Sequence, residues 1–168
     1  MVVAALAMAS CSKDESTGIN NGNAIDFRVA MQTRASETTT ANITNFFVTA
    51  LDKNNANYFT DAEFTKDGAF FTSDPDYFWP SDGSNLSFFA YSPSAAGLGA
   101  TVTINSTTKT LADFQPAATI ADQKDFITAT ATGSKTDEAA GVALTFGHRL
   151  SQIEIKAKNT NDGYVYKV

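Results

Sequence analysis

The sequence has few of the residues from which catalytic and metal-binding sites are built, with one cysteine and one histidine among 168 residues. A single cysteine excludes an internal disulfide, and the two residues together are too few for a cysteine–histidine zinc site. Charge is also scarce. Charged residues make up 18% of the chain, the formal net charge is -6, and lysine and arginine are scattered singly. Nucleic acid is therefore excluded as a partner, because binding it needs a basic stripe that neutralises phosphates.

The sequence also lacks an apolar run long enough to cross a membrane. Residues 1–10 (MVVAALAMAS) are apolar, but a membrane-spanning helix needs about 20 residues. Such a run ending in small residues is typical of the apolar region of a secretory signal. The positive residues that normally precede it are missing, so we expect the natural signal to begin upstream.

The only cysteine, Cys11, lies where this apolar run stops. Met8-Ala9-Ser10-Cys11 resembles a bacterial lipobox, with methionine where leucine is usual. Cys11 is accordingly the expected lipidation site, and its acyl chains would anchor the protein in the outer membrane. The acidic stretch 13–15 resembles the export tag of Bacteroides-type surface lipoproteins, and residues 12–24 have the composition of a flexible tether. The alternative is an ordinary leftover thiol.

From residue 25 onward the apolar residues alternate with a period of two, which is typical of half-buried strands. Turn residues such as Asp67-Gly68 and Asn161-Asp162-Gly163 separate short apolar runs, and no convincing amphipathic helix intervenes. This spacing predicts an all-β fold, an antiparallel β-sandwich over residues 25–160. The expected strands cover residues 25–31, 43–51, 58–64, 69–72, 77–79, 86–91, 101–104, 126–131 and 142–157.

Two patterns refine this expectation. Phenylalanine doublets at 46–47, 70–71 and 88–89 place aromatic rings on both faces of a strand, so we expect central strands with a loop over the second face. In the last run the apolar parity changes, which predicts a bulge or bend near Ser151-Gln152. After the turn at residues 161–163, residues 164–168 again have a strand-like pattern, and we interpret residues 161–168 as the start of a truncated following strand or domain.

Several segments resemble the N-terminal domain of the fimbrillin (Mfa-like) family of Bacteroides-type surface lipoproteins. They are TRA after the first strand, YFWPSDGSNLSFFAYSP, DFITATA and VALTFGHRLSQIEIKAKN, which follow one another in the family's order. The resemblance covers residues 25–159. It implies a transthyretin-like, Greek-key β-sandwich that forms the first of two domains. The expected second domain lies outside these 168 residues.

The resemblance also implies a function, that of a shaft, tip or anchor subunit of a cell-surface fimbria. In this family a trypsin-like protease cuts after an arginine or lysine that follows the first strand, and a neighbouring subunit donates a strand to the vacated groove. Here the cut would fall between Arg34 and Ala35. The implied partners are other fimbrial subunits, the processing protease and the lipid of the outer membrane. The side chains of the removable strand would be Ile25, Phe27, Val29 and Met31.

The residues leave other interpretations open. Arg34 also fits a solvated residue that ends an ordinary edge strand, and anchor-type members need not be cut. The aromatic residues Tyr77 and Trp79 are candidates for a sugar-binding platform, in which case the chain would be a surface-anchored carbohydrate-binding lipoprotein. Tyr77 and Trp79 are equally typical of a core.

We expect no enzyme activity, no catalytic residue and no cofactor. His148 shares its parity with core positions of the last strand, which indicates a structural role, and a cysteine–histidine nucleophile pair is excluded. The glycines at 97 and 99 lack the preceding strand and following helix of a phosphate-binding loop. Asp74, Asp76 and Asp82 are oxygen ligands suited to calcium, but Pro75 and Gly83 favour turns, so no metal is expected.

Overall fold

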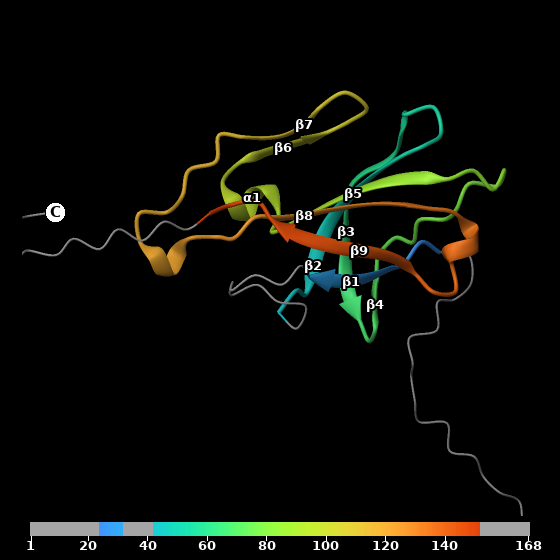
Figure 1. The fold of residues 1–168 in the computed structure, drawn as a ribbon, viewed down its shortest axis with the longest axis horizontal. Coiled ribbons are helices and arrows are strands. Elements are labelled where there is room, and N and C mark those ends of the chain that lie inside the picture. The colour runs from blue at the N-terminus through green and yellow to red at the C-terminus, as the bar shows by residue number, and fades with distance from the viewer. Residues whose placement is uncertain (1–23, 32–41, 152–168) are drawn as a thin grey trace, which may run out of the picture.

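The computed structural model describes residues 24–31 and 42–151, and nearly all of its regular structure is strand (Figure 1). The all-β prediction is therefore confirmed. The strands are β1 (Phe27–Met31), β2 (Asn45–Leu51), β3 (Asn57–Asp67), β4 (Phe70–Thr72), β5 (Leu86–Ser92), β6 (Thr101–Ile104), β7 (Lys109–Ala112), β8 (Ile127–Gly133) and β9 (Val142–His148). The described part of the chain also has three single-turn helices: α1 (Ala95–Leu98), η1 (Ile120–Asp122) and η2 (Lys135–Asp137).

Seven of these strands form one closed sheet in the order β1-β4-β3-β2-β5-β8-β9. All neighbours are antiparallel except β1 and β9, which run parallel from Phe27↔Val142 to Met31↔Phe146. The structure thus corrects the predicted antiparallel sandwich to a barrel-like closed sheet with one parallel pair. The physical reason is that β1 hydrogen-bonds to a neighbour on both edges, which leaves the main sheet without a free edge.

Phenylalanine rings dominate the interior of the barrel. One ring of each doublet points inward and is almost fully buried: Phe46, Phe71 and Phe88. Alternation along a strand sends the second ring of each doublet to the outer face, where it is only partly buried. The predicted two-faced burial is therefore confirmed.

A hairpin covers part of the outer face beside the outward rings of two doublets, Phe47 and Phe89, whereas the third doublet, in β4, lies away from it (Figure 1). Strands β6 and β7 form a separate two-stranded sheet, which Figure 1 shows on the opposite side of the molecule from β4. Its apolar side chains, with Leu98 of α1, pack against Phe47, Tyr91 and Phe126 in a second hydrophobic cluster. The hairpin extends this core beyond what the barrel alone encloses.

The structure departs from several of the predicted elements. Strand β7 and helix α1 were not expected from the sequence, and residues 77–79 form no strand but a single bridge, Ala24↔Phe78. The side chain of Ser94 accepts a hydrogen bond from the Gly97 amide, which caps α1. The predicted strand 142–157 is shorter in the structure, because β9 ends at His148 and residues 149–151 form no strand. Residues 152–157, with Gln152 of the predicted bend, lie outside the described residues.

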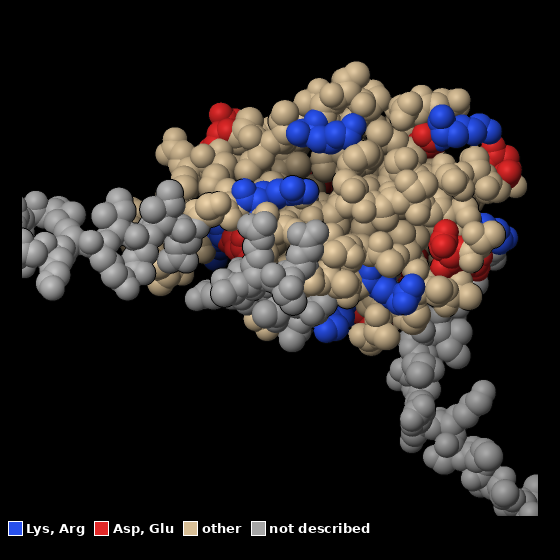
Figure 2. All heavy atoms as spheres, viewed as in Figure 1, with Lys and Arg blue, Asp and Glu red and all other residues tan. Residues whose placement is uncertain are grey.

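On the face that Figure 2 shows, lysine and arginine side chains lie apart from one another and do not gather into one patch. Within residues 24–31 and 42–151, no helix has the length and apolar character needed to cross a membrane.

Candidate functional site: strand β1 and its groove

Strand β1 closes the barrel between β4 and β9. Its pairing with β9 extends over five residues, whereas its pairing with β4 consists of one residue pair, Phe27↔Phe71. Removing β1 would therefore leave free edges on β4 and β9 and open the barrel between them. Free edges of this kind are templates for adding a strand from another chain.

The side chains predicted for the removable strand face the barrel interior. Ile25 and Phe27 are almost completely buried, and Val29 and Met31 are partly buried and pack against the same core. Burial thus declines along the strand from Ile25 to Met31. The position of all four side chains agrees with the alternation in the sequence.

Phe27 is the central side chain that β1 contributes to the barrel interior. Its ring meets those of Phe46, Phe64 and Phe88 edge-on, with centroid distances of 5.8, 4.7 and 5.1 Å. Each such aromatic pair contributes about 0.5–1.5 kcal/mol beyond area burial. Phe27 therefore links β1 to the adjacent strands β3, β2 and β5, and its departure would remove its contacts with three buried rings.

Backbone hydrogen bonds hold the start of the strand. The Ile25 amide donates to the Tyr77 carbonyl at 2.7 Å, and the Val142 amide donates to the Asp26 carbonyl at 2.8 Å. Arg28 Nε donates to the Gly141 carbonyl at 3.4 Å, a long and weak contact. These bonds add to the main-chain pairing of β1 with β9, which continues along the strand to Met31.

An acidic side chain, Asp26, is buried in the same stretch. The residue is 4% exposed, although alternation alone would place it on the solvent face. Burial raises the pKa of its carboxyl, and the negative charges of Asp76 and Asp67 contribute to the rise, which brings the pKa to about 6. Sequence reasoning missed this residue. The only signal was a carboxylate between two apolar residues, and its burial depends on how β1 is enclosed.

Three of the predicted site residues lie outside the described residues. They are Cys11, the lipidation site, and Arg34 and Ala35, the processing pair. In the sequence Arg34 follows Met31, the last residue of β1, by three positions.

The aromatic residues considered for a sugar platform lie mostly inside. Trp79 is 7% exposed, and its ring meets Phe88 edge-on at 5.9 Å. Tyr77 is partly buried and stacks on Phe59 with a centroid distance of 4.3 Å. A sugar platform needs ring faces open to solvent, so these two rings do not form one here. Their neighbour Phe78 is the exposed ring of this segment.

His148 has the surroundings of a structural residue. Its side chain is 5% exposed, and Nδ1 lies 2.6 Å from Asp125 Oδ2. The other ring nitrogen, Nε2, is buried and has no hydrogen-bond partner among the described residues. A general base must reach the proton that it removes, and a buried Nε2 is closed to substrate.

Of the three aspartates considered for calcium, Asp82 is engaged in an ion pair and a turn. Asp82 Oδ2 lies 2.5 Å from Lys53 Nζ, and this contact lowers the pKa of Asp82. The Asp82 carboxylate also accepts the Ser84 amide at 3.0 Å. In the described ranges, no three Asp, Glu, His or Cys side chains form a group suited to a metal ion.

Comparison with known proteins places this barrel in a family. A fimbrillin-like family model matches residues 33–168, which is most of the chain, and the chain belongs to that family. A fimbrial protein from Bacteroides vulgatus has a similar structure, with a TM-score of 0.52 and 18% identity over 76% of this chain and 45% of its own.

Two further solved structures show weaker likeness. A fimbrial protein from Bacteroides ovatus has a TM-score of 0.49 and 14% identity, over 76% of this chain and 29% of its own. The fimbrial anchor protein Mfa2 from Porphyromonas gingivalis has a TM-score of 0.43 and 15% identity, over 75% and 50%. The chain thus spans half or less of the length of these proteins. No curated protein matches the sequence.

Proposed function

We propose that the chain is a subunit of a cell-surface fimbria and that β1 is the strand it releases on joining a neighbouring subunit. The observation that carries the proposal is the position of β1, which fills the gap between β4 and β9 with the ring of Phe27 at its centre. Membership of the fimbrillin-like family supports the same role.

The proposed route to the surface rests on the sequence. Cys11 carries the lipid anchor, and the segment after it links this anchor to a β-domain that begins near residue 25. A protease cuts between Arg34 and Ala35, where the neighbouring residues are small or polar and suit a protease's active site. The cut separates β1 from the rest of the domain.

Replacement of β1 by a donor strand is energetically favoured over leaving the groove of β1 empty. Full burial of side chains such as Ile25 and Phe27 stabilises the fold by about 1.5–3 kcal/mol each. A typical domain is stable by only about 5–15 kcal/mol, so a vacated groove removes a large share of that margin. A donor strand with apolar residues at alternate positions restores both the burial and the main-chain hydrogen bonds.

The proposal is tested with the purified chain and an arginine-specific protease. Mass spectrometry should show a product that begins at Ala35, and thermal stability should fall when β1 leaves. A synthetic peptide of residues 24–32 should restore the stability, whereas the same peptide with Phe27→Asp should not, because a carboxylate would enter the aromatic core.

Arg34→Ala should block the cut, while Arg149→Ala, a change at an exposed arginine remote in sequence, should leave it intact. The proposal fails if removing β1 leaves the thermal stability unchanged. It also fails if both peptides restore stability equally.

A further inference from the structure

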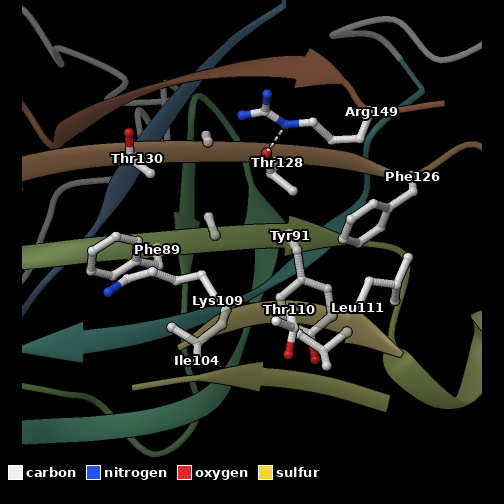
Figure 3. Close-up of a pocket in the computed structure, with 13 residues that line it drawn as sticks. Phe89, Tyr91, Ile104, Lys109, Thr110, Leu111, Phe126, Thr128, Thr130 and Arg149 are labelled. Atoms are coloured by element: carbon white, nitrogen blue, oxygen red, sulfur yellow. Dashed lines mark hydrogen bonds between the residues drawn. The ribbon is translucent and has the colours of Figure 1, made fainter. Parts of the chain in front are cut away.

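A cavity of about 340 Å³ lies outside the barrel, between the β6–β7 hairpin and the outer face of β5 and β8 (Figure 3). It is separate from the groove of β1, since no residue of β1, β4 or β9 lines it. Its size is at the lower end of the range for small-molecule sites, which is about 300–1,000 Å³.

The wall of the cavity is mostly apolar. The hairpin contributes three aliphatic side chains, and the sheet side contributes three aromatic rings. They are Val102, Ile104, Leu111, Phe89, Tyr91 and Phe126. The three aliphatic residues are only partly buried, so apolar surface remains open at this place. Open apolar surface in a concave site favours a ligand with a hydrocarbon part.

Among the described residues, both charged residues of the lining are basic, Lys109 and Arg149, and none is acidic. The positive charge of the lining contrasts with the net negative charge of the whole chain, which has 18 acidic and 12 basic residues. The two cations belong to different elements: Lys109 begins β7, and Arg149 follows β9.

Each of the two basic side chains makes local hydrogen bonds and keeps further N–H donors for a ligand. Arg149 Nε donates to Thr128 Oγ1 at 2.5 Å, and Figure 3 shows the rest of the guanidinium pointing away from that bond. Lys109 Nζ donates to the carbonyls of Asn105 and Ser106 at 2.9 and 3.1 Å and lies 4.6 Å from the centroid of the Phe89 ring. An ammonium group has three donors, so one remains for a ligand.

We propose that this cavity binds an amphipathic carboxylate, a small carboxylic acid with a hydrocarbon chain. The chain lies against the apolar wall, and the carboxylate accepts hydrogen bonds from Arg149, with Lys109 as a second positive charge. Charge complementarity selects the acid over a neutral molecule of the same shape. Inorganic phosphate is disfavoured because it has no hydrocarbon part to pack against the apolar wall.

The test is titration of the purified, delipidated chain with octanoate, followed by calorimetry and by NMR shifts of the lining residues. We expect saturable binding, and octan-1-ol and acetate should each bind at least tenfold more weakly. Arg149→Gln and Lys109→Gln should each weaken octanoate binding about tenfold, because a hydrogen bond to a charged group contributes that much. Leu111→Gln should weaken it through the apolar wall.

Lys135→Gln, a change at an exposed lysine of η2, is the matched control and should leave binding unchanged. The thermal stability of every variant shows whether it remains folded. The proposal is overturned if octanoate produces no saturable shifts, or if octan-1-ol binds as tightly as octanoate. It is also overturned if the folded Arg149 and Lys109 variants bind octanoate as the parent chain does.

Discussion

The buried carboxyl of Asp26 should make the stability of the barrel depend on pH. The carboxyl is almost unexposed, and its pKa in the folded chain is about 6, against an ordinary value of 3.8. The folded state therefore holds the proton more tightly than the unfolded chain does. The stabilisation by this proton is complete below about pH 4 and is lost as the pH rises through 6.

The magnitude follows from the two pKa values. The rise from 3.8 to about 6 corresponds to roughly 3 kcal/mol, at about 1.4 kcal/mol for each unit of pKa. This is the cost of holding Asp26 ionised at neutral pH. Asp26→Asn keeps the shape and removes the charge, so it should raise the free energy of unfolding by up to about 3 kcal/mol at pH 7.5 and change it little at pH 4.

Urea unfolding from pH 4 to pH 8 measures this effect, with the fluorescence of Trp79, the only tryptophan, as the signal. The exposed Asp122→Asn in η1 is the control and should leave the pH profile of the parent chain intact. The reasoning is refuted if Asp26→Asn is no more stable than the parent at pH 7.5, or if it keeps the parent's fall in stability between pH 4 and 6.

Three further predictions concern the core. Phe27→Ala should lower the free energy of unfolding by about 3–5 kcal/mol, measured by urea unfolding. The control Ala30→Ser, at an exposed residue of the same strand, should leave it unchanged. A loss below about 1 kcal/mol for Phe27→Ala would contradict the central place of this ring. Gly133→Ala should lower the free energy of unfolding by about 1–3 kcal/mol in the same assay, because the new Cβ would lie 2.9 Å from Val142 Cγ2 and 3.2 Å from Trp79 Cη2. Unchanged stability would contradict this close packing. Trp79 fluorescence should resist acrylamide and added glycans in the folded chain, and strong quenching by a glycan would instead support a sugar platform.

The sequence was sufficient to predict most strands, because each is a local alternation of apolar residues between turns. Strand β7 escaped prediction because Leu111 is its only large apolar residue. Its place depends on pairing with β6, from Thr101↔Ala112 to Ile104↔Lys109, rather than on its own pattern.

Closure of the sheet could not be predicted from local pattern. It depends on the pairing of β1 with β9, whose partners Phe27 and Val142 are far apart in the sequence. The burial of Asp26 is likewise a tertiary effect: alternation places the side chain opposite Phe27, and only the enclosed position of the segment keeps water away. The apolar face of β1 was predictable because Ile25, Phe27, Val29 and Met31 follow the two-residue period without interruption.

The most direct test of strand exchange is the N-terminus of the mature protein on the surface of the source bacterium, determined by intact mass and terminal sequencing. We expect a chain that begins at Ala35 and has lost the strand containing Phe27. A lipidated Cys11 with residues 25–34 still attached in assembled fimbriae would contradict the release of β1. A free, unlipidated Cys11 would contradict the proposed lipoprotein route.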